Sequence, residues 1–270
     1  MYDFNFTRPT SVAEAIRAIS ASEDGQFIAG GHTSIPVLKQ RLAMPTDLID
    51  LAKIDGLSNI CRDADGFVIG AMTPHVKVAR SDALLKAIPA LSELAGMIGD
   101  PHVRNRGTIG GSIANNDPAA DYPAALVGLG ATVKTNQREI VADEFFRDLF
   151  ETALEGDELI TAVHFPVPDK AAYMKFPNPA SRYAIVGVFV SQTGQNVRVS
   201  VTGAGPCVFR VLEMESALAA RFSPEVIDGM KISNSDLNSD IHASAEYRAH
   251  LVAVMAKRAV AKAIKVISNE

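Results

Sequence analysis

The chain has 270 residues, of which 47% are hydrophobic and 21% charged, so it can bury one large core or two modest ones. Its formal net charge of −5 argues against nucleic acid as a main partner, because phosphate binding calls for a basic surface. No apolar run reaches the roughly 18 residues of a membrane span, and no secretory signal pattern follows Met1, which predicts a cytoplasmic protein.

The first fifty residues have the pattern of a small β-α-β unit. Ser11 and Glu14 are spaced as a capping box and predict the start of an amphipathic helix over residues 11–20. Three further elements are expected, namely a strand at 26–29, a helix at 36–41 and a strand at 47–51.

A glycine loop lies between the first of these strands and its helix. Gly30 and Gly31 follow an apolar strand end, and Ser34 is placed to cap the helix that contains Pro36. Paired glycines let the backbone pass close to a bulky group, because no Cβ stands in the way. One such loop is a weak indication of a ligand site.

The middle of the chain is expected to contain a hairpin over residues 58–72, followed by a helix that starts at Thr73. Residues 83–98 have helical periodicity that is interrupted at Pro89. Residues 100–107 are interpreted as an irregular link.

A second glycine loop of the same design follows this link. Thr108 and Ile109 precede Gly110 and Gly111, and Asp117 with Pro118 indicates a helix start. We expect that helix to span 118–129 with a bend at Pro123. Backbone amides near a helix start bind phosphate, so the two loops together predict a dinucleotide clamped between them.

The last hundred residues are interpreted as a separate domain after Pro166 and Pro168. A hairpin at 131–141 and a strand at 158–165 precede this boundary. Beyond it we expect strands at 183–190, 196–202 and 206–210, a helix at 212–221 and a long helix at 243–267. The cations near the end of the long helix suit its dipole and indicate a solvated surface.

The two loops carry a family resemblance. Residues 29–34 and 108–112 resemble the two FAD-binding motifs of the medium, flavoprotein subunit of the xanthine dehydrogenase family of molybdenum hydroxylases, and especially the carbon monoxide dehydrogenase group. The resemblance extends from Phe6 to Arg248. Thr33 stands where serine is commoner in the family, and Ser112 stands where asparagine is usual.

The resemblance implies an α+β fold. A two-lobed FAD-binding domain of the vanillyl-alcohol-oxidase (PCMH) type is expected over residues 1–168, with lobes at about 1–54 and 55–168 and FAD in the cleft between them. A C-terminal α+β domain, a three-stranded antiparallel sheet packed against helices, is expected over 169–270.

The resemblance also implies a set of FAD contacts, with no catalytic residue and no metal ligand in this chain. Glycine amides would face the pyrophosphate, and Asn115 and Asp121 would bind the ribityl chain. Val103 and Ile160 would pack on FAD, while Lys175 would approach the flavin edge. The full expected set is Ala29, Gly30, Gly31, His32, Thr33, Ser34, Ile35, Val103, Thr108, Ile109, Gly110, Gly111, Ser112, Asn115, Ala120, Asp121, Ile160, Lys175 and Tyr183, with Tyr183 covering one flavin face.

The implied function is electron transfer within a complex. Molybdopterin would belong to a large partner subunit and iron–sulfur clusters to a small one, in a dimer of heterotrimers. The cysteine count agrees with this division, since Cys61 and Cys207 are too few to ligate a cluster. Noncovalent FAD would pass electrons to an external acceptor. A stand-alone FAD oxidoreductase and a flavin-free scaffold are the alternatives, while NAD binding is disfavoured because no Gly-x-Gly-x-x-Gly pattern occurs.

Overall fold

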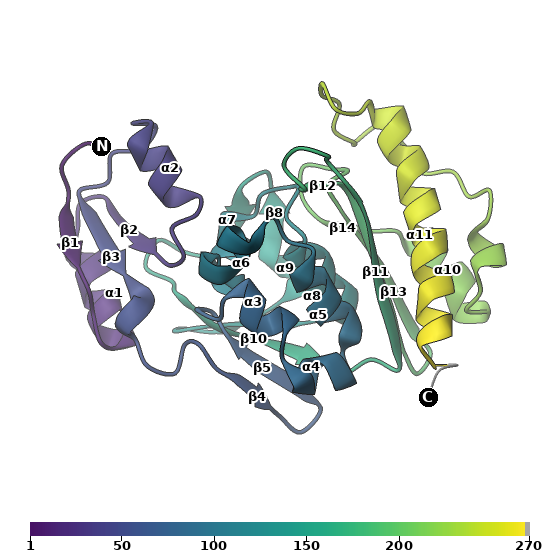
Figure 1. Ribbon diagram of the computed structural model, residues 1–270, viewed down its shortest axis with the longest axis horizontal. Helices are drawn as coiled ribbons and strands as arrows, with labels where there is room; N and C mark the ends of the chain where they lie inside the picture. Colours follow the sequence, from purple (N-terminus) through teal and green to yellow (C-terminus); the bar gives the residue numbers. More distant parts are fainter. Residues whose placement is uncertain (268–270) are drawn as a thin grey trace.

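The computed structural model describes residues 1–267, which form three sheet-centred bodies arranged in a row (Figure 1). The first body is built on a parallel sheet with strand order β1-β3-β2. Its elements are β1 (Asn5–Thr7), α1 (Val12–Ala21), β2 (Gly25–Ile28), α2 (Ser34–Lys39), β3 (Asp47–Asp50) and the 3₁₀ helix η1 (Leu51–Lys53).

The predicted cap of the first helix is confirmed with one difference. The Ser11 side chain accepts a hydrogen bond from the Glu14 amide at 3.2 Å, as a capping box requires. The Glu14 carboxylate accepts from the amide of Thr10 rather than from that of Ser11. The helix packs Ala15 and Ile19 into the small core beneath the parallel sheet.

The second body contains an antiparallel sheet with strand order β4-β5-β10-β6-β7. Its strands are β4 (Ile60–Arg62), β5 (Gly66–Gly70), β6 (Thr132–Thr135), β7 (Glu139–Val141) and β10 (Ile160–Pro166). A two-stranded ribbon accompanies it, formed by β8 (Phe146–Asp148) and β9 (Glu151–Thr152).

Short helices complete this second body. They are α3 (His75–Ala79), α4 (Asp82–Ala87), α5 (Pro89–Gly96), α6 (Pro101–Arg106), α7 (Ile109–Asn115), α8 (Tyr122–Leu129) and α9 (Ala142–Phe145). The break at Pro89 is confirmed, because Pro89 begins α5. The predicted irregular link at 100–107 is wrong: Asp100 caps α6 by accepting from the Val103 amide at 3.0 Å, and Pro101 occupies the first turn.

The start predicted for the helix over 118–129 is also wrong. Asp117 closes a turn by accepting from the Ala119 amide at 2.9 Å, and α8 begins only at Tyr122. Pro123 therefore lies in the first turn, where a missing amide hydrogen costs nothing, and it does not bend the helix.

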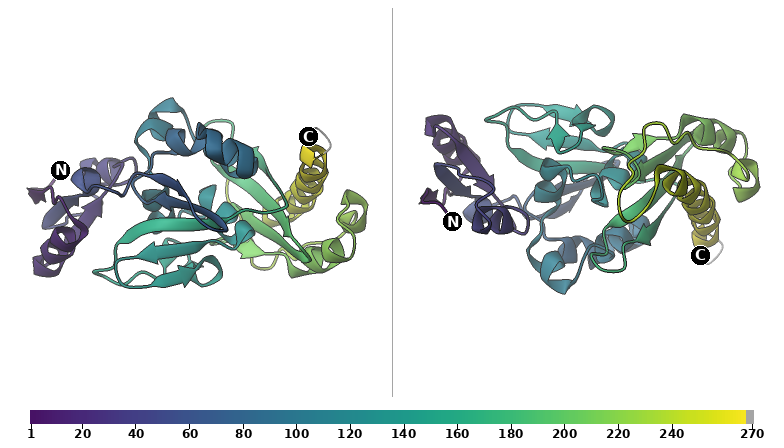
Figure 2. Two further views of the ribbon diagram at one scale, coloured as in Figure 1. Left: turned by 90° about the horizontal axis from the view of Figure 1, so that it is seen from below. Right: turned by 90° about the horizontal axis from the view of Figure 1, so that it is seen from above.

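The third body is an antiparallel sheet with order β11-β12-β13-β14 and helices on its outer face. Its elements are β11 (Lys170–Pro177), β12 (Ala184–Thr193), β13 (Asn196–Thr202), β14 (Phe209–Arg210), α10 (Leu212–Ala220), the 3₁₀ helix η2 (Pro224–Ile227) and α11 (Ala245–Ile267). The sequence predicted three of these strands, and β11 is the additional one. Figures 1 and 2 show α11 running along one face of this sheet, where it packs on β11 and β12.

The third sheet is buried on both faces. Tyr173 and Phe189 point into the core shared with the second body, whereas Val188 and Val190 pack against α10 and α11. Hydroxyl groups hold α8 to the sheet: Ser200 donates to the Ala124 carbonyl and Thr202 to the Ala120 carbonyl, both at 2.6 Å. The predicted α+β class is confirmed.

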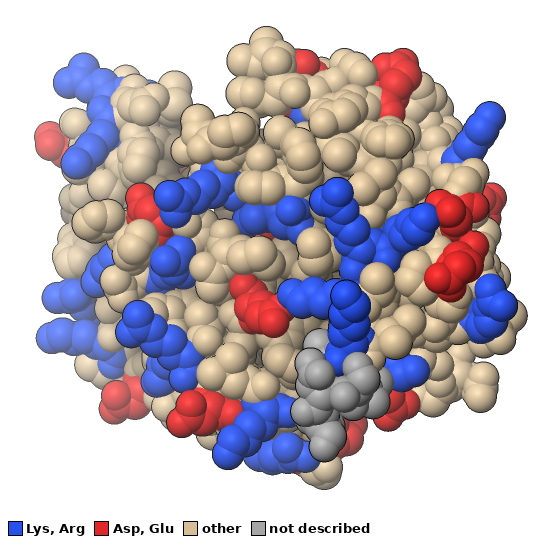
Figure 3. Space-filling view, turned by 45° about the vertical axis from the view of Figure 1, so that its right-hand side comes forward, with Lys and Arg blue, Asp and Glu red and all other residues tan. Residues whose placement is uncertain are grey.

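The charged surface is mixed in sign. Figure 3 shows Lys and Arg side chains interspersed with Asp and Glu over the face that includes the end of α11. Lys257 pairs with Asp228 at 2.7 Å, and Lys262 pairs with Glu93. Within residues 1–267 no helix combines the length and the apolar composition that crossing a membrane requires.

Candidate functional site

A cleft of about 620 Å³ separates the first body from the second. This volume lies within the range of small-molecule and cofactor sites. Both glycine loops line the cleft, together with the strand end at Ile160 and the turn that carries Tyr183. The two loops therefore face the same space, although they belong to different bodies.

The first loop connects β2 to α2 and presents free amides. Gly31 has a φ of +73°, which a residue with a side chain rarely adopts. Among the described residues, the amides of His32, Thr33 and Ser34 donate to no other group of the chain. Successive free amides of this kind form a concave site for anionic oxygen atoms.

Close approach between the loops explains why Gly30 has no side chain. A Cβ atom at Gly30 would lie 2.1 Å from the carbonyl oxygen of Arg106 and 2.9 Å from the Cα of Gly107. A Cβ atom at Gly111 would lie 3.0 Å from Thr108 Oγ1 and 3.7 Å from the Cβ of Ala29. Any side chain at Gly30 would therefore push the two walls of the cleft apart.

The second loop differs from our expectation, because it joins α6 to α7 rather than a strand to a helix, and Gly110 and Gly111 lie in the first turn of α7. Gly110 donates its amide to the Ala71 carbonyl at 2.8 Å, and Gly111 donates to Thr108 Oγ1 at 3.1 Å. These amides are engaged inside the protein, so in this conformation they do not face a pyrophosphate. Gly110 is needed for packing, because its Cβ would lie 2.7 Å from the Ala71 carbonyl oxygen. Ser112 and Asn115, one turn further along α7, line the cleft with polar side chains.

Asp121 belongs to a buried polar group that joins the second and third bodies. Its carboxylate accepts from the Tyr173 hydroxyl at 2.6 Å and lies 3.0 Å from Lys175 Nζ. Burial raises the pKa of Asp121, and the Lys175 charge and the Tyr173 hydrogen bond oppose that shift. Lys175 also donates to the Met97 carbonyl, and its side chain is 3% exposed. Lys175 is therefore held behind the wall of the cleft by Asp121 and does not line it.

A histidine that we did not predict as a site residue lines the cleft, and it packs against a tyrosine that is buried behind the lining. This histidine is His75, and the centroids of the His75 and Tyr122 rings are 5.3 Å apart. Burial lowers the pKa of His75 to about 4, and the positive charges of His32 and Arg104 act in the same direction, so its ring is neutral at pH 7. His75 Nδ1 and the Tyr122 hydroxyl are buried without a hydrogen-bond partner among the described residues.

Tyr183 is held at the rim by a tight turn. Asn178 Oδ1 accepts from the amides of Ala180 and Ser181, and the Asn178 amide donates to the Tyr183 carbonyl at 2.8 Å. The Tyr183 ring is half exposed, and burial together with the charges of Asp117 and Asp121 raises its pKa. A neutral aromatic ring is thus presented to the cleft.

The structure brings most of the predicted contacts together. Ile35, Ile109 and Lys175 do not line the cleft; Ile109 is buried in the main core, and Ile35 packs against Gly31. The other expected residues do line it, namely Ala29, Gly30, Gly31, His32, Thr33, Ser34, Val103, Thr108, Gly110, Gly111, Ser112, Asn115, Ala120, Asp121, Ile160 and Tyr183. Lining residues that the sequence did not indicate include His75, Leu154, Glu158, Leu159 and Arg182. No local pattern distinguishes them.

Comparison with known proteins agrees with this architecture. Residues 2–168 match the family described as the FAD binding domain in molybdopterin dehydrogenase, and residues 171–263 match the CO dehydrogenase flavoprotein C-terminal domain. The chain is 33% identical to the nicotine 6-hydroxylase medium subunit of Paenarthrobacter nicotinovorans and 33% identical to the carbon monoxide dehydrogenase medium chain of Afipia carboxidovorans, over 96% of each chain in both cases. A solved structure of reconstituted CO dehydrogenase from Oligotropha carboxidovorans superposes with a TM-score of 0.88 at 32% identity, over 97% of both chains.

The fold and the cleft thus define an FAD-binding oxidoreductase subunit. More particularly, the chain belongs to the family of FAD-binding medium subunits of molybdenum hydroxylases, the group that includes the carbon monoxide dehydrogenase medium chains.

Proposed function

We propose that the chain is the flavoprotein subunit of a molybdenum hydroxylase complex, in which electrons from iron–sulfur clusters of a partner chain reach an external acceptor through noncovalently bound FAD. The observation that carries this proposal is the meeting of two glycine loops, one from each of the first two bodies, at a single cleft of cofactor size. Relatives named as medium subunits and medium chains, matched over nearly their full length, support the assembly.

Different residues of the cleft contact different parts of FAD. The free amides of His32, Thr33 and Ser34 bind the pyrophosphate, and Ser112 with Asn115 binds phosphate or ribityl oxygens. When bound, the flavin supplies the redox chemistry, while this chain supplies position and electrostatics. The remaining expected contacts, among them Val103, Ile160 and Tyr183, stay predictions that a complex with FAD will test.

The partners follow from the same proposal. A large molybdopterin subunit and a small iron–sulfur subunit bind this chain, and two such heterotrimers form a dimer in the cytoplasm. The division of the chain into an FAD-binding domain at 1–168, with lobes at 1–54 and 55–168, and a domain at 169–270 also stays a proposal. It is supported by the separation of the three sheets; residues 268–270 lie outside the described residues.

Substitution of Gly111 tests the placement of FAD. Gly111→Val adds an isopropyl group between the loops, where the Cβ atom alone would lie 3.0 Å from Thr108 Oγ1. We therefore expect the purified protein to retain under a tenth of the wild-type flavin, on the order of a 1.4 kcal/mol loss or more. The control is Gly96→Val at the end of α5, where a Cβ meets only the Ala79 Cβ at 3.9 Å. A folded Gly111→Val protein with full flavin content contradicts the placement.

The absorption spectrum of the complex, purified through a tag on this chain, separates the proposal from its alternatives. Flavin bands together with iron–sulfur absorbance, and molybdenum by metal analysis, are expected for a hydroxylase subunit. A flavin spectrum without the other centres favours a stand-alone FAD oxidoreductase, and a colourless protein that takes up no FAD favours a scaffold. Release of all the flavin on denaturation is expected for noncovalent binding.

A further inference from the structure

One residue of the second body completes the core of the first. Leu159 is 5% exposed and packs in an apolar cluster whose other buried members lie between Ala15 and Leu57. Leu159 also lines the cleft, between Glu158 and Ile160. The segment that contains Leu159 therefore contacts both the N-terminal core and the space between the glycine loops.

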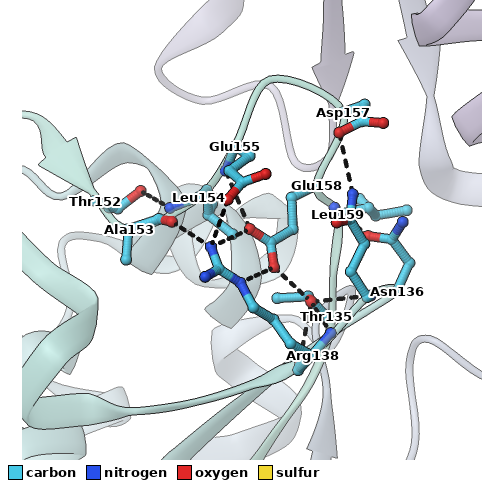
Figure 4. Close-up of polar contacts among 11 residues, drawn as sticks. Thr135, Asn136, Arg138, Thr152, Ala153, Leu154, Glu155, Asp157, Glu158 and Leu159 are labelled. Atoms are coloured by element: carbon cyan, nitrogen blue, oxygen red, sulfur yellow. Dashed lines mark hydrogen bonds and ion pairs between the residues drawn. The ribbon is translucent and has the colours of Figure 1, made fainter.

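This segment, residues 153–159, precedes β10 and is fixed by side chains from the hairpin between β6 and β7 (Figure 4). Arg138 donates from Nε and Nη2 to the two oxygens of Glu158, at 3.0 and 2.9 Å, and from Nη2 to the Ala153 carbonyl at 2.9 Å. Thr135 Oγ1 donates to Glu158 at 2.7 Å. We call Thr135, Asn136, Arg138 and Glu158 the hairpin cluster.

Both the backbone amide and the backbone carbonyl of Leu159 are hydrogen-bonded to Asn136. Its amide donates to Asn136 Oδ1 at 2.7 Å, and its carbonyl accepts from the Asn136 amide at 3.0 Å. The Glu155 amide donates to Glu158 at 3.1 Å and tightens the turn that precedes Leu159. The hairpin cluster thus determines where the Leu159 side chain enters the N-terminal core.

The hairpin cluster contains one positive and one negative side chain, and the negative one is buried. The Glu158 side chain is 0% exposed, while that of Arg138 is 43% exposed. Removing the Arg138 guanidinium would leave the buried Glu158 carboxylate without its main partner. An uncompensated buried charge strongly destabilises the folded state. Glu158 would then turn toward the cleft or toward solvent, and the segment before Leu159 would move with it.

We propose that the hairpin cluster is a positioning device for FAD: by fixing Leu159 in the N-terminal core, it sets the distance between the two lobes across which FAD binds. This inference rests on the proposed FAD site. Each lobe supplies one glycine loop, and a cofactor that contacts both loops binds well only when their separation is fixed before binding. Arg138 does not itself line the cleft; it acts through Glu158 and Leu159, which do.

The test compares two bidentate Arg–Glu pairs in the full-length chain. Arg138→Gln removes the pair of the hairpin cluster, and Arg210→Gln removes the pair between Arg210 and Glu215 in the third body, which has distances of 2.9 and 2.6 Å. FAD affinity is measured by quenching of flavin fluorescence, and apo-protein stability by thermal unfolding. We expect both variants to lower the melting temperature, whereas only Arg138→Gln raises the dissociation constant of FAD, by about tenfold or more, equivalent to about 1.4 kcal/mol.

Two further variants keep the test decisive if Arg138→Gln does not fold. Leu159→Ala leaves the hairpin cluster intact and removes only the inserted side chain. Thr135→Val keeps nearly the same shape and removes the hydroxyl that bonds Glu158 and the backbone of Gln137 and Arg138. Both are expected to weaken FAD binding. Thr135→Val combined with Leu159→Ala is expected to weaken it by less than the product of the single effects, because Thr135 acts through Leu159.

The outcomes distinguish this inference from the proposed function. Wild-type protein that binds no FAD would overturn the function. A different result would overturn the positioning role alone. In that result the wild-type protein binds FAD, and the Arg138→Gln and Leu159→Ala variants bind it as tightly as the Arg210→Gln variant.

Discussion

At the scale of single residues, Glu158 shows that a carboxylate can be buried as a charge when both of its oxygens accept hydrogen bonds. Glu158 accepts four hydrogen bonds, which lower its pKa from 4.5 to about 2 against the opposing effect of burial; those from Arg138 have the largest effect, followed by those from Thr135 and the Glu155 amide. Gly30 has a different requirement, namely the absence of a Cβ atom, because a Cβ would clash with the carbonyl of Arg106. Both residues act on the cleft through backbone position.

The depressed pKa of Glu158 predicts a pH dependence of stability. A carboxylate with a lower pKa in the folded state contributes stability above its unfolded pKa of about 4.5, and this contribution is lost as the pH falls toward 2. Glu158→Gln should therefore reduce the free energy of unfolding by about 1–3 kcal/mol at pH 7 and by much less at pH 3. Urea denaturation of both proteins at the two pH values measures this difference. An equal loss at both values contradicts the ionic role.

Elements in this fold are joined by polar contacts as well as by apolar ones. The start of α8 meets β11 through Asp121, Tyr173 and Lys175, which are buried between the second and third bodies. A second polar seam runs along α8, where Ser191 donates to the Gly128 carbonyl at 2.6 Å. These contacts fix the wall of the cleft that Asp121 contributes.

Removal of the Lys175 charge is expected to make the fold sensitive to pH. Burial already raises the pKa of Asp121, and Lys175→Met removes the charge that opposes this shift. A raised folded-state pKa means that stability is lost as pH rises, so Lys175→Met should cost about 3–5 kcal/mol at pH 8 and clearly less at pH 5. Urea denaturation at both pH values checks this. Lys262→Met, whose partner Glu93 is half exposed, serves as the control and should cost under about 1 kcal/mol.

At the scale of the whole molecule, the three bodies have unequal shares in cofactor binding. The first two provide the walls of the cleft, and the third contributes chiefly the turn at residues 180–183. α11 lies on the far face of the third sheet (Figure 2). A ligand bound between the first two bodies should therefore stabilise them more than it stabilises α11.

Hydrogen exchange tests this unequal stabilisation. FAD at 100 times its dissociation constant should add about 2.7 kcal/mol to the stability of the state that binds it. Added protection is expected in residues 29–35, 108–121 and 153–160, with little change in residues 245–265. Uniform protection of the whole chain would show that the bodies unfold as one unit.

Local signals in the sequence predicted much of the fold and of the site. Ser11, Pro89 and the glycine pairs act within a few residues of their own position, and each marks a boundary or a loop that the structure contains. The start of α8 was misplaced because Asp117 with Pro118 and Asp121 with Pro123 offer similar signals, and tertiary contacts decide between them. β11 was missed because its neighbouring prolines masked a strand.

The hairpin cluster marks what sequence patterns do not reach. Arg138 and Glu158 are 20 positions apart, and each reads as an ordinary surface charge by itself. Leu159 reads as a member of its own strand, although it completes a core formed mainly by residues before Leu57. Such contacts depend on how the two lobes pack, and the spacing of residues along the sequence does not predict that packing.

The position of Leu159 also has a consequence for biosynthesis. Residues 15–57 leave the ribosome about 100 residues before Leu159 does, which at 5–20 residues per second corresponds to roughly 5–20 s. During this interval the nascent N-terminal segment exposes the apolar surface that Leu159 later covers. A chaperone that recognises short apolar segments has its opportunity to bind there before Leu159 is synthesised.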